Sequence, residues 1–316
     1  MVVKRIKMAT FLLLFFYINL PTFAQSPFAY NGFKIDNPSI PKSEIRHGGP
    51  GRDGIPSIDH PKFISASHAT YLNDYDRILG VSINGVSKAY PIRIMDYHEI
   101  VNDEFNGKPV VITYCPLCGS GISFDAEIDG QKRTFGVSGL LYNSDVLLYD
   151  RETQSLWSQI LSEAISGPSK GKLLTPIITT STTWVKWKAL HPDTEVLSTE
   201  TGHSRNYDRS PYGNYNLERS LYFPVKNQSD KYHPKELVIG IKIGSKYKAY
   251  PFSELENKGQ SQISDSFNGQ KLIIEYDKSS GYAQIKTAKG KELHGTTLFW
   301  FAWYAFHPDT EIYIAE

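Results

Sequence analysis

The sequence predicts a mainly β (β-rich α+β) protein made of two related β lobes with a few short helices. Three observations support this prediction. The aromatic residues are abundant, with 20 Tyr, 16 Phe and 5 Trp, and such side chains suit pleated sheets. Strand-like runs are joined by Asn-Gly and Asp-Gly pairs, which favour two-residue hairpins. Motifs from the first part of the chain recur in the same order in the second part.

The N-terminus has the pattern of a secretory signal peptide. Three basic residues precede the apolar run Met8–Leu20, and small residues follow it. Because the run is shorter than the ~20 residues that span a bilayer, cleavage after Ala24 is favoured over a membrane anchor. We therefore expect an exported protein, periplasmic or secreted, with no transmembrane segment after signal cleavage.

The distribution of charged residues argues against one class of partner, nucleic acid. The chain has 34 basic and 33 acidic residues, and removal of Lys4, Arg5 and Lys7 with the signal leaves a net charge of about −2. The charges are interspersed, and a surface without a basic stripe argues against nucleic-acid binding. No phosphate loop, metalloprotease motif or nucleophile turn occurs. The sequence therefore indicates no nucleic-acid partner and names no other.

A polar arm is expected to precede the sheets. Gln25–Asp76 is rich in Gly, Pro and Ser and has no long helical or strand period, so it should lie extended across the domain. The clear strand signal begins at Arg77. The elements expected from there are a hairpin of Ile78–Ile83 and Val86–Ile92, a short helix or turn over Asp96–Asn102, the strand-like run Val110–Phe124 with a turn inside it, a hairpin of Ile122–Ile128 and Lys132–Val137, a strand over Leu140–Tyr149 and a short helix over Thr182–Leu190.

Turn pairs and residue spacing determine where these elements begin and end. The pair Asn84-Gly85 favours a type I′ hairpin turn because both residues tolerate positive φ. Trp184 and Trp187 are spaced i, i+3, as on one face of a helix. Pro192 then ends that helix because proline has no N–H to donate.

The second part of the chain repeats the first. The repeated motifs are KAYP at 88–91 and 248–251, FNG at 105–107 and 267–269, and HPDTE at 191–195 and 307–311. Three matches in one order indicate an internal duplication. The predicted segments are the signal peptide at 1–24, a first lobe with the extended arm and the CPLCG turn at 25–225, and a shorter, degenerate second copy at 226–316.

The differences between the two copies point to the functional residues. Asp277 stands in the second copy where Cys115 stands in the first, and Ser280 stands where Cys118 does. The second copy also has no counterpart of His98. Features that both copies share should belong to the scaffold, so features found only in the first copy are candidates for function.

Cys115 and Cys118 are the two cysteines of the chain and lie in a tight C-P-L-C-G turn. Such a turn resembles half of a rubredoxin-type knuckle, in which two thiolates bind one metal ion. Our leading hypothesis is therefore metal binding or handling by these thiolates, with His98 as a third ligand. Thiolates combined with imidazole suit a copper or zinc ion.

Two alternatives remain open. The C-x-x-C spacing also occurs in thiol-disulfide oxidoreductases, although the residues after Cys118 favour a strand, not the helix whose N-terminus would lower the thiol pKa. The cysteines could instead form an inert clip in a partner-binding scaffold, but a disulfide across so short a loop would be strained and would stabilise the fold little. The sequence does not decide whether the protein is an enzyme, so we assign no catalytic residue.

Several long motifs together resemble one family, the uncharacterised prokaryotic domain-of-unknown-function family numbered 3179. The motifs are GRDGIPSID (Gly51–Asp59), KAYP (Lys88–Pro91), HEIVND (His98–Asp103), VITYCPLCGS (Val111–Ser120) and FGVSGLLYNSDVLLYDRETQSLWSQ (Phe135–Gln159). The likeness runs from about Arg46 to Tyr215, with a degenerate echo in Leu237–Ile314.

The resemblance implies a fold unit and a set of signature residues, in exported prokaryotic proteins, and no reaction. The signature includes His98, Cys115, Cys118, Ser144 and Trp157 of this sequence. On this basis we take Ser144 and Trp157 as candidate cofactor-binding residues. The second lobe departs from the pattern because it lacks the cysteines, so a site there should be lost.

Overall fold

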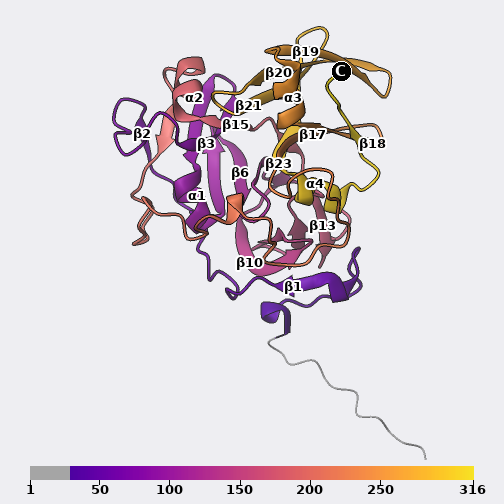
Figure 1. Cartoon of the computed structure of the whole chain (residues 1–316). Helices are drawn as coiled ribbons and strands as arrows, with labels where there is room; N and C mark the ends of the chain where they lie inside the picture. The colour runs from indigo at the N-terminus through magenta and orange to yellow at the C-terminus, as the bar shows by residue number, and fades with distance from the viewer. Residues whose placement is uncertain (1–28) are drawn as a thin grey trace, which may run out of the picture.

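The computed structural model describes residues 29–316, and the signal peptide predicted at 1–24 lies outside these residues. The prediction of a mainly β protein is confirmed, because most elements are strands (Figure 1). In this part of the chain the strands form five sheets of four or five strands and one two-stranded sheet. Four α-helices of seven residues each accompany them, namely α1 (Ile92–His98), α2 (Trp184–Leu190), α3 (Phe252–Lys258) and α4 (Trp300–Phe306). Within the described part of the chain, none of the helices is long and apolar enough to cross a bilayer.

The hairpins predicted from Asn-Gly and Asp-Gly pairs are present. β3 (Arg77–Ile83) and β4 (Val86–Pro91) are joined by Asn84 and Gly85, whose φ angles are 50° and 82°. Positive φ at both positions is what a type I′ turn requires. The helix expected over Asp96–Asn102 is α1, which begins earlier, directly after Pro91, and ends at His98.

A sheet of order β14-β7-β6-β5 contains both flanks of the CPLCG turn. Its strands are β5 (Ile100–Phe105), β6 (Lys108–Cys115), β7 (Ser120–Asp125) and β14 (Pro176–Ile177). The central pair is almost fully buried on both faces. For this reason the run Val110–Phe124 is rich in apolar residues and does not alternate regularly with exposed polar ones; its hydroxyl residues Thr113, Ser120 and Ser123 are buried as well.

In the next sheet the observed strands differ from two of the predicted ones. Its order is β1-β10-β11-β12-β13, and its strands are β1 (Ile45–His47), β10 (Phe135–Tyr142), β11 (Asp145–Asp150), β12 (Leu156–Ser158) and β13 (Glu163–Ser166). The strand predicted at Lys132–Val137 was wrong because those residues are divided between β9 (Gln131–Lys132) and β10. The single strand predicted over Leu140–Tyr149 was wrong because the chain reverses at Asn143 and Ser144. All residues of β10 and β11 are buried, so the apolar pattern continues through a hairpin turn that contains no glycine.

Two further parts of the chain contain short strands, namely the segment between β7 and β10 and the N-terminal arm. β8 (Glu127–Ile128) and β9 (Gln131–Lys132) form the predicted Asp129-Gly130 hairpin. The arm expected at Gln25–Asp76 is described from Ala29 onward. It contains the 3-10 turns η1 (Ala29–Gly32) and η2 (Lys42–Glu44) and the strands β1 and β2 (Phe63–Ser65), and β1 pairs with the edge of β10.

Two sheets in different parts of the chain share one order of four strands, and the first of them has a fifth strand, β2, at its edge. One is β15-β3-β4-β16-β2 and the other is β23-β17-β18-β24. The bounds of the strands not yet given are β15 (Thr180–Thr183), β16 (Glu195–Leu197), β17 (Leu237–Ile243), β18 (Lys246–Pro251), β23 (Gly295–Phe299) and β24 (Glu311–Ile312). In both sheets the third and fourth strands pair in parallel. A further sheet, β19-β20-β21-β22, contains β19 (Gln262–Phe267), β20 (Gln270–Asp277), β21 (Tyr282–Thr287) and β22 (Glu292–Leu293).

The motifs that recur in the sequence make equivalent contacts in these two sheets. Trp187 of α2 packs on Gly80, and its Nε1 donates to Thr194 Oγ1 at 2.9 Å. Trp303 of α4 packs on Gly240 in the same way, and its Nε1 donates to the Thr310 hydroxyl at the same distance. An internal duplication would produce this likeness between the two sheets. The duplication itself and the boundary between the two lobes at residue 225 stay predictions.

The earlier and the later part of the chain, which we call the two halves, are joined by hydrogen bonds at two turns, one at Cys118 and one at Ser280. The backbone N–H of Phe299 donates to the Cys118 carbonyl at 2.8 Å. In the opposite direction, Arg77 Nη1 donates to the Ser280 carbonyl at 2.6 Å. One hydrophobic core also contains Cys115 and Cys118 together with aromatic side chains of α4. The CPLCG turn therefore lies where the two halves meet.

Candidate metal centre

The CPLCG turn joins β6 to β7. Cys115 is the last residue of β6 and pairs with Ser120, the first residue of β7. The Cys118 N–H donates to the Cys115 carbonyl at 3.1 Å, and Gly119 has a φ of 61°. Glycine takes this left-handed conformation at little cost. The predicted turn is thus present and connects two strands, not a strand and a helix.

Both cysteines are free thiols in the interior of the protein. Cys115 is 1% exposed and Cys118 is 0% exposed. Their sulfur atoms donate to the same acceptor, the Ser144 carbonyl oxygen, at 3.6 Å from Cys115 and 3.4 Å from Cys118. The two sulfurs therefore point into one common space.

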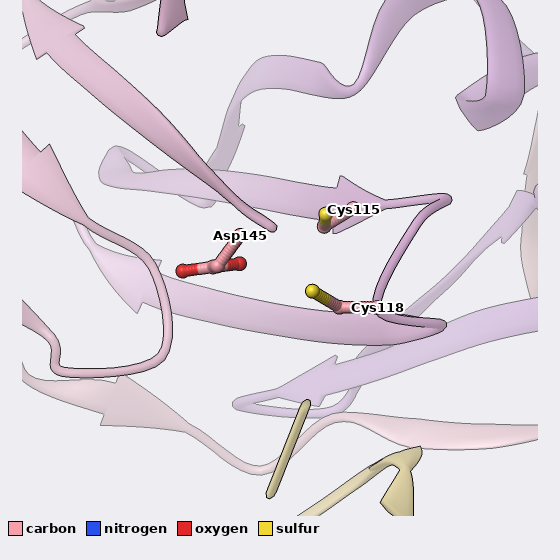
Figure 2. A group of neighbouring side chains, drawn as sticks. All are labelled: Cys115, Cys118 and Asp145. Carbon is pink, nitrogen blue, oxygen red and sulfur yellow. The ribbon is translucent and has the colours of Figure 1, made fainter. Parts of the chain in front are cut away.

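The β10–β11 hairpin brings a carboxylate to the same space. Its turn residues Asn143 and Ser144 have φ angles of 51° and 64°, and Asp145 is the first residue of β11. Ligand atoms of Asp145, Cys115 and Cys118 all lie within 4.8 Å of one another, and Figure 2 shows the three side chains converging. Asparagine tolerates a positive φ, but serine does so only with strain, so the strain of this turn lies at Ser144. The turn places the carboxylate of the next residue.

The Asp145 carboxylate is fully buried and only half satisfied. Its Oδ2 accepts the Ile160 N–H at 3.0 Å, whereas Oδ1 has no hydrogen-bond partner among the described residues. Burial raises the pKa of Asp145 to about 8, and the backbone N–H groups of Ile160 and Val146 oppose this rise. A protein rarely leaves a buried carboxylate oxygen unpaired, so this atom is available to a ligand.

The Cys118 thiol is held in the protonated form. Burial raises the pKa of the Cys118 thiol well above its usual range, and the nearby Cys115 and Asp145 raise it further. Glu99, also buried, would raise the pKa of Cys118 further if it ionised, but burial raises the pKa of Glu99 itself to about 8. No described lysine or arginine forms an ion pair with Asp145 or Glu99. Cys118, Asp145 and Glu99 are therefore acidic side chains that burial keeps protonated at neutral pH.

His98, the predicted third ligand, is not part of this group. It is the last residue of α1 and is fully buried, with Nδ1 at 2.7 Å from the Pro56 carbonyl and Nε2 at 2.7 Å from the Tyr207 hydroxyl. Burial lowers the pKa of His98 to about 4, so the ring is neutral. Nδ1 then donates to the carbonyl, and the lone pair of Nε2 accepts the Tyr207 O–H. The structure brings Asp145, not His98, to the two thiols.

The two predicted cofactor-binding residues have other partners. Ser144 Oγ donates to the Phe223 carbonyl at 2.8 Å, so Ser144 faces the thiols with its backbone carbonyl and not with its hydroxyl. Trp157 is 0% exposed and lies in the same core as the cysteines, and its Nε1 donates to Asp150 Oδ2 at 2.8 Å. As side chains that contact a cofactor, Ser144 and Trp157 stay predictions.

Asp145 was not among the metal ligands that the sequence predicted. It belongs to the region Gly136–Gln159 that the second copy lacks, and it follows Asn143 and Ser144, which are both common in turns. An Asn-Ser turn signal at this point would have placed Asp145 at the start of a strand. Proximity to the cysteines, which are about thirty residues earlier, depends on how the two hairpins pack.

One family model matches the chain. It is described as a protein of unknown function (DUF3179), and it matches residues 52–294, which is more than half of the chain. The match includes the CPLCG turn and the β10–β11 hairpin. No curated protein and no solved structure matches the sequence.

Proposed function

The chain belongs to the DUF3179 family of unknown function, and we propose that this member binds a soft metal ion, copper or zinc, through Cys115, Cys118 and Asp145. One observation carries the proposal: two thiol sulfurs and a carboxylate oxygen, all buried, lie within 4.8 Å of one another. Metal–sulfur and metal–oxygen bonds to zinc are about 2.0–2.3 Å long, so three donors around one ion lie at such separations.

The charges of the group favour a cation as its ligand. Deprotonation of two thiols and a carboxyl would leave three buried negative charges, which the apolar surroundings oppose. A bound metal ion replaces those protons and compensates most of the charge, as in other thiolate sites. Soft sulfur donors select copper(I) and zinc over magnesium or calcium.

The thiol-disulfide alternative has less support from the geometry. Exchange requires a thiolate that a partner disulfide can reach. Here the thiols are at most 1% exposed, and burial keeps the pKa of Cys118 high. The flanking elements are strands, so no helix N-terminus stabilises a thiolate at either cysteine.

Export is part of the proposal and is supported by the predicted signal peptide at 1–24. The test is the N-terminal sequence of the protein recovered from the periplasm or the medium of a bacterial host. A mature chain that begins at Gln25 is expected. A full-length chain retained in the cytoplasm would contradict export.

Elemental analysis tests metal binding directly. The mature protein, reduced and then reconstituted with copper(I) or zinc, should retain about one equivalent of metal after gel filtration. Cys115→Ser/Cys118→Ser should retain none, and Asp145→Asn should bind at least about tenfold more weakly, since removing a group that supports a metal site already costs 10–100-fold.

His98→Gln is the matched control for the third ligand. His98 is buried and neutral like the site residues but lies outside the group, so this variant should keep the wild-type metal content. Absence of metal above background in the reconstituted wild-type protein would exclude the proposed function. A reduction potential near that of exchange catalysts, together with no metal, would favour the oxidoreductase.

A further inference from the structure

A cavity lies against the CPLCG turn and is lined by residues from both the earlier and the later part of the chain. Its volume is about 420 Å³, and Pro116 and Gly119 of the turn form part of its wall. Ile92, Leu237 and Phe299 provide an apolar surface. The size falls within the range of cavities that bind small molecules.

Two cations without a carboxylate partner line this cavity. Arg77 donates from Nη1 to the Ser280 carbonyl at 2.6 Å and from Nη2 to Ser181 Oγ at 2.9 Å. Lys235 is 5% exposed, and its Nζ donates to the carbonyls of Glu218 at 3.0 Å and Ser220 at 2.7 Å. Within residues 29–316 neither cation forms a salt bridge, so neutral oxygens are the acceptors that hold both charges.

Both cations keep N–H groups that these acceptors do not use. A guanidinium has five N–H donors, and Arg77 uses three of them, including a long contact of 3.5 Å to the Gly281 carbonyl. An ammonium has three, and Lys235 uses two. The ammonium also lies 3.8 Å from the centre of the Tyr215 ring, which helps to fix its position.

One carboxylate lines the same cavity and does not cancel the two cations. Asp96 accepts a hydrogen bond from Ser210 Oγ at 2.9 Å and makes no ion pair with either cation. The other polar side chains of the wall are neutral donors and acceptors, namely Tyr114, Ser181, Ser210, Tyr212, Tyr215 and Asn216. Two positive charges and one negative charge leave the cavity with a net positive charge.

We propose that this cavity binds a small organic acid, whose carboxylate contacts Arg77 and Lys235 and whose apolar part lies against Ile92, Leu237 and Phe299. The planar fork of an arginine suits a carboxylate, and a lysine adds a point charge. The apolar wall favours an organic acid over an inorganic anion. The site is separate from the thiol group, so it does not depend on metal binding.

A structural role for the two cations is the competing explanation. Arg77 joins the first half to the Ser280 loop, and Lys235 fixes the backbone of residues 218–220. If these cations only support the fold, their replacement should lower stability while no acid binds to the wild-type protein. The experiment therefore measures binding first and stability second.

Isothermal titration calorimetry on the mature, metal-free protein is the test. Benzoate and hexanoate are the probes, benzyl alcohol is the neutral analogue and inorganic phosphate is the comparison anion. Saturable binding of at least one acid at one site per chain, with no binding of benzyl alcohol, is expected. Failure of both acids to bind, or binding of phosphate alone, would overturn the proposal.

Three variants locate the site. Lys235→Gln should weaken binding of the acid by about tenfold or more, whereas Lys242→Gln, which removes an exposed cation outside this cavity, should leave it unchanged. Asn216→Trp, at an exposed position on the wall, should block binding while both cations stay. Asn216→Trp is the deciding variant if Lys235→Gln does not fold. Wild-type affinity for the acid in Asn216→Trp would contradict the proposal.

The two proposals fail in different ways. Cys115→Ser/Cys118→Ser should lose metal and keep wild-type affinity for the acid. If this variant also loses the acid while its thermal unfolding is unchanged, the two sites are not separate and the inference is wrong in this form.

Discussion

The Cys118 sulfur donates to the Ser144 carbonyl oxygen at 3.4 Å, and this contact joins two hairpins that are distant in the sequence. One is the β6–β7 hairpin with the CPLCG turn, and the other is the β10–β11 hairpin with its two positive-φ residues. Because Asp145 directly follows Ser144, the backbone geometry that places the carbonyl also places the carboxylate. The predictions below test this arrangement and the fold that surrounds it.

The native thiols should react slowly with a thiol reagent. Cys115 and Cys118 are at most 1% exposed, so modification must wait for local opening. We expect the reaction with Ellman's reagent to be slower in the native than in the urea-unfolded protein by on the order of a hundredfold or more. Ser204→Cys in the Cys115→Ser/Cys118→Ser background places a thiol at an exposed position and should react at the unfolded rate. Equal rates for native wild type and this control would refute the burial of the site.

The turn at Ser144 should be more stable with glycine than with alanine. Both variants lose the hydrogen bond from Ser144 Oγ to the Phe223 carbonyl, which costs about 1 kcal/mol. Alanine keeps the strain of a φ of 64°, whereas glycine relieves about 1–2 kcal/mol of it. The urea-unfolding free energy should therefore rank Ser144→Gly above Ser144→Ala. The reverse order would show that the turn is not strained.

Stability should fall as the pH rises, and Glu99 should contribute to this fall. Burial raises the pKa of Glu99 from 4.5 to about 8, so the folded protein keeps a proton that the unfolded chain loses. The stability that Glu99 contributes is then fully present below pH 4.5 and is lost as the pH rises to about 8. Glu99→Gln should flatten this decline in the free energy of unfolding of the metal-free protein, leaving the parts due to Asp145 and Asp96. An unchanged slope in Glu99→Gln would show that Glu99 ionises normally.

A methyl group at position 80 should disturb the fold. A Cβ on Gly80 would lie 2.4 Å from the Trp187 ring, so the ring or the strand has to move. Overpacking of this kind costs about 1–3 kcal/mol, and Gly80→Ala should lower the free energy of unfolding by that amount. Gly51→Ala is the control, since nothing lies within 4 Å of a Cβ there. Equal stability of the two variants would contradict the packing of Trp187.

The predictable parts of the fold were those with local signals. Asn84-Gly85 gave a hairpin with both φ angles positive, and Pro192 follows a helix that ends at Leu190. The strand flanks of the CPLCG turn also follow from their apolar runs. The prediction of a single strand over Leu140–Tyr149 failed because the chain reverses at Asn143 and Ser144. The turn there contains no glycine, and the apolar pattern continues through it.

The candidate site was only partly predictable. The comparison of the two copies selected Cys115 and Cys118 because the second copy lacks them. It also selected His98, whose ring nitrogens are both used by Pro56 and Tyr207. Asp145 depends on a contact between two hairpins about thirty residues apart, and residue spacing along the chain carries no information about such a contact.

The hydrogen bond from the Phe299 N–H to the Cys118 carbonyl has a consequence for truncated forms of the protein. A chain that ended at residue 225 would keep both cysteines and Asp145 but would lose the backbone partner of Cys118 and the α4 side chains that cover the thiols. Such a fragment would expose apolar surface that the whole chain buries. Residues 226–316 therefore supply part of the core in which the thiol pair is buried, although they contain no cysteine themselves.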